Sequence, residues 1–232
     1  MVEIKGLEKL APRDFPGHIS ATVFTGGCNF RCPYCHNADL VLKPGSLVTI
    51  PREEFLEFLD LRRGWLEAVC VTGGEPLMHE DLGDILGTVK ERELLVKLDT
   101  NGSFPQRLRE LISTGLVDFV AMDIKAPIEK YDEAAGGAVD TEAVRESISV
   151  LRESGCGHLF RTTVVPGLLQ SADIEAIAAM LEEAEEYLLQ PFVTGRTLDP
   201  AYAARPSCSE EELSRLAGIA RQFIPRVTVG GN

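Results

Sequence analysis

The sequence has 232 residues, of which 44% are hydrophobic and 25% are charged, a balance typical of folded globular proteins and unlike disordered, collagen-like or coiled-coil chains. Asp and Glu number 36 against 23 Lys and Arg, and the formal net charge of −13 disfavours non-specific binding to nucleic acid or to anionic membranes. No stretch approaches the roughly 18 uninterrupted apolar residues of a membrane span, and residues 1–10 carry four charges, so we expect a cytoplasmic protein with no membrane contact.

Apolar runs of strand length alternate along the chain with segments of helical periodicity. We expect strands at residues 19–24, 68–72, 94–99, 119–123, 159–165, 187–192 and 227–229. We expect helices at residues 52–61, 82–92, 106–114, 141–154, 171–184 and 209–224. Such alternation predicts an α/β fold with parallel strands, in which six βα units form either an incomplete barrel or an open doubly wound sheet. We expect a single domain over residues 1–232, with a core at about 15–195 and the last helix appended.

Polar groups follow the predicted strands at the points where the strands end. Cys28 begins a cysteine-rich loop after the first strand, and Gly73-Gly74-Glu75 follows the second. Asp99-Thr100-Asn101, Asp123 with Lys125, and Arg161 belong to the next three. Because functional sites in parallel α/β folds lie at the carboxyl ends of the strands, we expect these groups to meet there.

Three of the six cysteines, Cys28, Cys32 and Cys35, lie within eight residues in the spacing C-x3-C-x2-C. A cubane iron–sulfur cluster normally has four cysteine ligands, so three thiolates would leave one iron open to a substrate or cofactor. The alternatives are a zinc site completed by His36, which is poorly placed beside Cys35, and three ordinary free thiols. Cys70 is expected in the core, and Cys156 and Cys208 are expected to be ordinary surface or half-buried cysteines.

The segment Cys28-Asn29-Phe30-Arg31-Cys32-Pro33-Tyr34-Cys35-His36-Asn37 resembles the signature of radical S-adenosylmethionine (SAM) enzymes. Gly73-Gly74-Glu75-Pro76 resembles the glycine-glycine-glutamate motif of that superfamily. Asp99-Thr100-Asn101-Gly102 and Asp123-Ile124-Lys125 resemble motifs of glycyl-radical-enzyme activases. Over roughly residues 4–200, the chain is similar to the activating proteins of anaerobic ribonucleoside-triphosphate reductases.

The resemblance implies a partial (β/α)6 barrel of the radical SAM type. It also implies a [4Fe–4S] cluster held by the three cysteines, with SAM chelated to the open iron by its amino and carboxylate groups. A low-potential cluster then delivers an electron into the sulfur–carbon bond of SAM, and the resulting 5′-deoxyadenosyl radical abstracts a hydrogen atom. The residues implied in cofactor binding are Tyr34, Gly73, Gly74, Glu75, Asp99, Thr100, Asn101, Asp123, Lys125 and Arg161.

Structural roles compete with several of these assignments. The two glycines alone fit a plain turn, Tyr34 fits an aromatic cap on the core, and Asp99 fits an Asx-turn. Lys125 and Arg161 fit a structural ion pair with Asp123. The formate-lyase activases have a histidine after the late proline-aromatic turn that contacts SAM, and Val193 stands here instead, so recognition at that edge must differ.

We therefore expect an oxidoreductase that generates a glycyl radical on an anaerobic ribonucleotide reductase. Its electron donor would be a protein such as flavodoxin or ferredoxin. The alternatives are a small-molecule radical SAM enzyme similar to 7-carboxy-7-deazaguanine synthase, an activase of a formate-lyase-like enzyme, and a zinc-binding module without catalysis.

Overall fold

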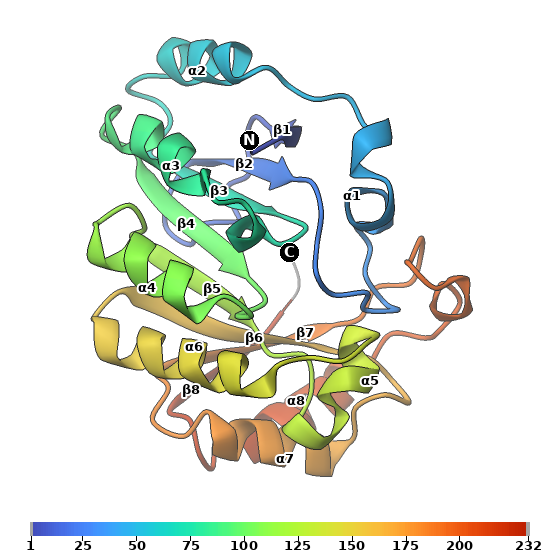
Figure 1. Ribbon diagram of the computed structural model, residues 1–232. Helices are drawn as coiled ribbons and strands as arrows, with labels where there is room; N and C mark the ends of the chain where they lie inside the picture. Colours follow the sequence, from blue (N-terminus) through green and yellow to red (C-terminus); the bar gives the residue numbers. More distant parts are fainter. Residues whose placement is uncertain (1, 231–232) are drawn as a thin grey trace.

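The computed structural model describes residues 2–230, and its framework is one eight-stranded sheet whose strands lie in chain order (Figure 1). The strands are β1 (Ile4–Glu8), β2 (Ser20–Thr25), β3 (Ala68–Gly73), β4 (Leu95–Thr100), β5 (Phe119–Asp123), β6 (Gly157–Val164), β7 (Glu186–Pro191) and β8 (Arg226–Val229). Strand β1 is antiparallel to β2, and every later neighbour is parallel.

The longer helices connect the parallel strands and cover the outer face of the curved sheet, whereas the five-residue helices α1 and α5 lie at the carboxyl ends of the strands (Figure 1). They are α1 (Ala38–Leu42), α2 (Arg52–Leu61), α3 (Leu82–Lys90), α4 (Pro105–Ser113), α5 (Tyr131–Ala135), α6 (Thr141–Ser154), α7 (Ser171–Met180) and α8 (Glu210–Ala220). Short 3-10 turns occur at Pro44–Ser46, Pro76–Met78, Ile128–Lys130 and Pro200–Tyr202. Within residues 2–230, β1 and β8 form no ladder with each other, so the sheet is an incomplete barrel.

The alternation of side chains along each strand explains how one sheet carries both a core and a site. One set of positions is apolar and fully buried against the helices, as at Val69 and Val71, Val96 and Leu98, Val120 and Met122, and Tyr187 and Leu189. The intervening positions point to the concave face and are mostly polar, as at Lys97 and Asp99 of β4. The closed barrels of other α/β proteins fill this volume with branched aliphatic side chains. Here the polar residues leave room for a cavity.

The six predicted βα units are confirmed, and the structure resolves their arrangement as an incomplete barrel. The predicted boundaries of β5, α2 and α6 agree with the structure, and the other elements shift by a few residues. The sequence analysis missed β1, which contains Gly6, and the five-residue helices α1 and α5, which are too short to show a helical period.

The helix ends follow ordinary capping chemistry. The N-cap of α6 is Asp140, and its carboxylate accepts hydrogen bonds from the backbone N–H groups of Glu142 and Ala143. Gly155 ends α6 in the left-handed conformation, and Ser209 caps α8. Among residues 2–230, every helix is too short or too polar to cross a membrane.

We predict that Asp140→Ala lowers the free energy of unfolding by about 1 kcal/mol, because the first turn of α6 loses its side-chain acceptor. Asp140→Asn keeps an acceptor oxygen and should remain within a few tenths of a kcal/mol of the parent. Urea unfolding followed by circular dichroism measures both. Equal losses in the two variants would show that the acceptor oxygen is not what stabilises this helix.

Candidate active site

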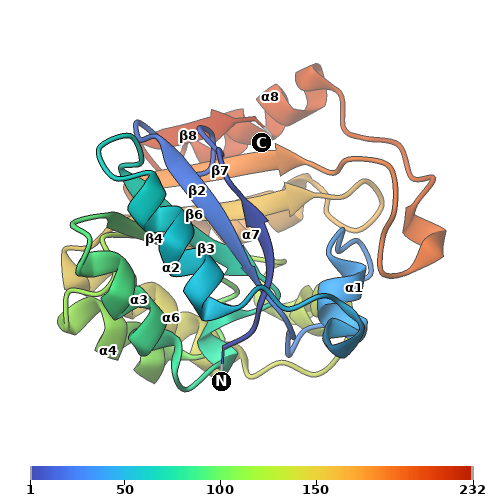
Figure 2. The ribbon, with the colours of Figure 1, turned by 90° about the horizontal axis from the view of Figure 1, so that it is seen from above.

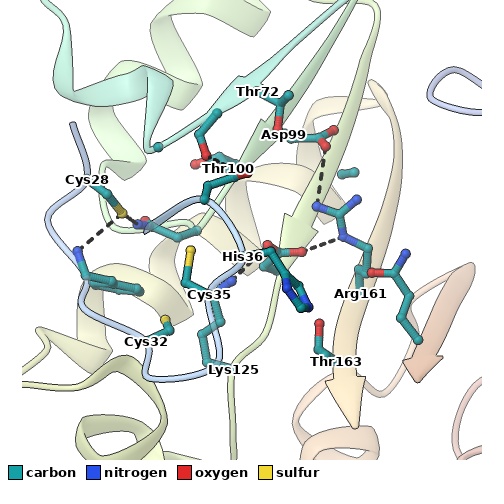
Figure 3. A pocket seen from close by; sticks show the side chains of 18 of the residues that line it. Cys28, Cys32, Cys35, His36, Thr72, Asp99, Thr100, Lys125, Arg161 and Thr163 are labelled. Atoms are coloured by element: carbon teal, nitrogen blue, oxygen red, sulfur yellow. Dashed lines mark hydrogen bonds and ion pairs between the residues drawn. The ribbon is translucent and has the colours of Figure 1, made fainter. Parts of the chain in front are cut away.

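A cavity of about 500 Å³ lies on the concave face of the sheet and contains the cysteine loop, residues 26–37 (Figure 3). Its walls come from side chains at alternate positions of β3 to β7, with the cysteine loop across one end. Arg13, Asp14 and Pro16 line it as well, and they belong to the connection between β1 and β2. The sequence motifs from different strands therefore do converge on one space.

All three motif cysteines line this cavity, with Cys32 buried and Cys28 and Cys35 half-buried. Burial raises the pKa of the Cys28 thiol to about 12, and it also raises the pKa of Cys32 and Cys35. The backbone N–H of Phe30 donates to Cys28 Sγ at 3.4 Å, and the Asn101 side chain donates to the same sulfur at 3.9 Å. Thiols so far from water become thiolates only when a strong cation replaces their protons, so this donor set fits a metal cluster.

Close contact with the backbone of the preceding strand and of the cysteine loop requires glycine at both positions at the end of β3. A Cβ on Gly74 would lie 1.7 Å from the carbonyl oxygen of Gly27, and one on Gly73 would lie 2.4 Å from the backbone nitrogen of Thr25. Gly73 also has a φ of +116°, which L side chains rarely adopt. In addition, the N–H of Glu75 donates to the Gly27 carbonyl at 2.8 Å. The collision that glycine avoids is with this chain's own backbone.

Glu75 is fully buried and points away from the cavity into the joint between β3 and β4. Its carboxylate accepts hydrogen bonds from the Leu77 N–H at 3.1 Å, the Thr100 hydroxyl at 2.8 Å and the Asn101 N–H at 2.7 Å. Burial raises the pKa of Glu75 to about 7, whereas these three donors act in the opposite direction and favour the ionised form. The geometry therefore gives Glu75 a positioning role for Thr100 and Asn101.

A chain of alternating charges crosses the cavity wall from β4 to the end of β5 (Figure 3). Lys97 pairs with Asp99, Arg161 bridges Asp99 at 3.4 Å and Asp123 at 2.5 Å, and Lys125 pairs with Asp123 at 2.8 Å. We call these five residues the ion chain. It holds three cations and two carboxylates, so it leaves a surplus positive charge facing the cavity.

Burial alone would raise the pKa of Asp123, but the Arg161 and Lys125 cations outweigh it and hold that pKa well below its usual range. Burial likewise opposes the charge on Lys125, and Asp123 outweighs it and raises the pKa of the ammonium. The structural ion pair that the sequence allowed for Lys125 and Arg161 is thus present. Because all members except Lys97 are predicted site residues, pairing and cavity lining coexist in the same side chains.

The remaining predicted residues divide between lining and support. Tyr34 is buried and lines the cavity, with its ring 6.5 Å from that of Tyr202. Thr100 and Asn101 also line it while contacting Glu75. The Asx-turn considered for Asp99 is instead made by Asn101, whose side-chain oxygen accepts from the Ser103 N–H at 3.0 Å.

Residues 192–205, which we call the strap, hold the outer side of the cysteine loop. The backbone N–H groups of Leu198 and Asp199 donate to the carbonyls of Cys35 and Pro33, both at 2.9 Å. His36 donates from Nδ1 to the carbonyl of Arg196 at 2.9 Å, and its ring stacks on Phe192. His36 is therefore engaged with the strap, and in residues 2–230 no three His, Cys, Asp or Glu side chains converge as a single metal ion requires.

Sequence reasoning missed four contributors to this site. Lys97 was hidden within an apolar run, and the strap has no periodic pattern. Asn37 donates to the Gly73 carbonyl at 3.1 Å, and His79 donates to the Gly26 carbonyl at 2.9 Å. The position of Asn37 directly after the cysteine motif was the one available signal.

Comparison with known proteins bears on this arrangement. The profile of the Radical SAM superfamily matches residues 22–184. The chain is 32% identical over 231 residues to MJ1227 of Methanocaldococcus jannaschii, named as a glycyl-radical enzyme activating enzyme, and the match covers 97% of this chain and 95% of that protein. It is 34% identical over 130 residues to the pyruvate formate-lyase-activating enzyme of Clostridium pasteurianum, covering 54% of this chain and 53% of that one.

The fold has solved counterparts. The crystal structure of Streptococcus suis SuiB bound to S-adenosylmethionine superposes with a TM-score of 0.69 at 13% identity. The superposition covers 88% of this chain and 48% of SuiB. At that identity the likeness concerns the fold alone, and it agrees with the incomplete parallel barrel described above.

We predict that Gly74→Ala displaces the cysteine loop, because the new methyl group would lie 1.7 Å from the carbonyl oxygen of Gly27, which belongs to that loop. We expect the free energy of unfolding to fall by about 1–3 kcal/mol and the iron bound after anaerobic reconstitution to fall at least twofold. The matched control is Gly87→Ala in α3, where nothing lies within 4 Å and stability should rise by about 0.5–1 kcal/mol with iron unchanged. Parent-level iron in Gly74→Ala would refute the packing argument.

The ion chain predicts a pH-dependent difference between the parent and Asp123→Asn. Because the pKa of Asp123 is depressed in the folded state, its stabilisation is complete above about pH 4 and is lost as the pH falls through the folded value. We expect the free energy of unfolding of Asp123→Asn to be lower than that of the parent by about 2 kcal/mol or more at pH 7, because two cations lose their partner. This difference should become smaller below pH 4. Urea unfolding across pH 3–7 measures it, with the exposed Glu175→Gln as control. A gap that stays constant with pH would contradict the assignment.

Proposed function

The chain is a radical SAM enzyme of the glycyl-radical-enzyme-activating family, which uses a [4Fe–4S] cluster and S-adenosylmethionine, and we propose that its target is an anaerobic ribonucleoside-triphosphate reductase. When bound, these cofactors supply the one-electron chemistry that removes a hydrogen atom from the α carbon of a glycine. The partner in this proposal is a protein, and the residues of the chain bind, orient and shield the reacting groups.

We assign the three thiolates of Cys28, Cys32 and Cys35 to three irons of the cluster, which leaves one iron for SAM. Lys125 lies beside Cys32 and Cys35 (Figure 3), and its ammonium suits the SAM carboxylate. Asp99 and Asp123 offer oxygen acceptors for the SAM amino group, ribose hydroxyls or a monovalent cation. Tyr34 offers an aromatic face for adenine, and Thr100 and Asn101 lie where Glu75 fixes them.

The observation that carries this proposal is the convergence of the thiols and the ion chain on one cavity. A preorganised set of charges needs no reorganisation when ligand charge arrives, and exclusion of water protects a reactive carbon radical from side reactions. Glu75 and the glycine contacts supply the rigidity, because they tie the ends of β2, β3 and β4 together.

The choice of the reductase rests on the resemblance in Phe15-Pro16-Gly17, Arg161, Pro166-Gly167 and Gln190-Pro191-Phe192. In the structure, Pro16, Arg161 and Gln190 of these segments line the cavity. The similarity to MJ1227, over nearly the whole of both chains, supports a glycyl radical enzyme as the partner class.

The test is to reconstitute the cluster anaerobically, add SAM and reductant, and incubate the enzyme with an anaerobic ribonucleotide reductase. We predict a glycyl radical on the reductase, detected by electron paramagnetic resonance, together with 5′-deoxyadenosine. The reductase with its target glycine replaced by alanine should give no glycyl signal.

Replacing Cys28, Cys32 or Cys35 with alanine should lower SAM cleavage at least 100-fold, because three thiolates are the minimum for the site-differentiated cluster. Cys156→Ala is the matched control. A radical formed only on a formate-lyase-like protein would redirect the proposal to that partner. SAM cleavage stimulated by a small molecule such as a pterin, with no radical on either protein, would overturn it.

A further inference from the structure

The charge of the chain is distributed unevenly between the face around the cysteine loop and the rest of the molecule. Residues 26–51 and 191–208 carry four cations and two carboxylates. The remainder carries 19 cations and 34 carboxylates, which is strongly acidic. The four cations are Arg31, Lys43, Arg196 and Arg205, and the two carboxylates are Asp39 and Asp199.

The two segments form one face of the structure. Arg196 pairs with Asp39 at 2.7 Å, and the strap bonds the backbone of the cysteine loop through Leu198 and Asp199. Seen from above, α1 and the strap both lie beyond the carboxyl ends of the strands (Figure 2). We call the exposed part of these segments the cysteine-loop face. Helix α5, with exposed Asp132 and Glu133, borders it next to Arg31.

Several side chains of this face are available to a partner. Lys43 is exposed and has no ion pair within residues 2–230, and Arg196 keeps 72% of its side chain exposed beside Asp39. Arg31 is exposed and donates to the carbonyls of Cys28 and Phe30, so its charge is not neutralised by a carboxylate. Three large apolar side chains in the same segments are also exposed, namely Leu42 at 49%, Val48 at 84% and Val193 at 58%.

We propose that the cysteine-loop face is the docking surface for a small acidic redox protein that reduces the cluster. An acidic donor is repelled by most of this chain, so a locally cationic face orients it on encounter. Exposed apolar side chains together with unneutralised cations suit the small, transient interface of an electron-transfer pair. The face is formed by the loop that carries the three thiols and by the strap bonded to its backbone, so a donor docked there lies next to the metal site.

The electron balance is simple for a flavin donor. One electron leaves the flavin hydroquinone, which becomes the semiquinone, and that electron enters the iron–sulfur cluster. The inference rests on the proposed function only in requiring a reducible cluster. It does not depend on which protein receives the glycyl radical.

The test compares the parent with Lys43→Glu/Arg196→Glu, and reduced flavodoxin with dithionite as electron donors. With flavodoxin, we expect the double variant to need about tenfold more donor for half-maximal SAM cleavage in the absence of a glycyl radical partner. With dithionite, which needs no protein docking, its rate should equal that of the parent. Isothermal titration with oxidised flavodoxin should show the same loss of affinity. Adding salt should weaken the parent's affinity and leave that of the variant nearly unchanged.

Arg62→Glu/Arg63→Glu is the matched control, because Arg62 and Arg63 are exposed cations at the end of α2, at the opposite end of the strands, and Arg63 pairs with Asp60 as Arg196 pairs with Asp39. It makes the same change in net charge and should keep the flavodoxin affinity of the parent. Equal losses in the two double variants would overturn the proposal in favour of net charge alone. An unchanged flavodoxin dependence, or an equal loss with dithionite, would overturn it as well. The radical test on the reductase is a separate experiment, so its failure would leave these outcomes interpretable.

Discussion

The close contact between the backbone of Gly27 and the Gly73–Glu75 turn determines where every other part of the site lies. It seats the cysteine loop on the end of β3 with no side chain between them, and it turns the Glu75 carboxylate toward β4. Glu75 then fixes Thr100 and Asn101, and Asn101 reaches back to the sulfur of Cys28. Three motifs separated by some 70 residues of sequence thus form one hydrogen-bonded unit, and a Cβ at one glycine is enough to break it.

The ion chain removes five charged groups from water, which is energetically unfavourable, and the open concave face provides the space for it. Charges removed from water are destabilising unless they are paired, and the alternation Lys97, Asp99, Arg161, Asp123, Lys125 gives each interior member two partners of opposite sign. Its surplus positive charge favours a ligand that brings a carboxylate. The same pairing that stabilises the fold therefore orients the groups that meet the ligand, so structural and functional roles are not alternatives at these positions.

Much of this architecture was readable from the sequence, because buried parallel strands are short apolar runs and the site lies where they end. Lys97 shows the limit of that method. Its run, Leu95 to Thr100, looks like core until the strand register shows that Lys97 and Asp99 face the cavity and not the helices. The competing roles of Asp99 and Asn101 in the Asx-turn could not be separated either, since both precede the same glycine. The role of the strap could not be predicted from the sequence, because its contacts are made by backbone groups and do not require particular residue types.

The placement of the cavity separates the path of the electron from the path of the substrate peptide. Its lining runs from the cysteine loop to Arg13, Asp14 and Pro16, which lie in the connection at the amino end of β2. In the proposed arrangement, electrons enter through the cysteine-loop face, whereas a glycine-bearing peptide has to reach the concave side of the sheet. A donor docked on the first face leaves the second open. Reduction and hydrogen abstraction can then occur in one assembly, without the donor leaving first.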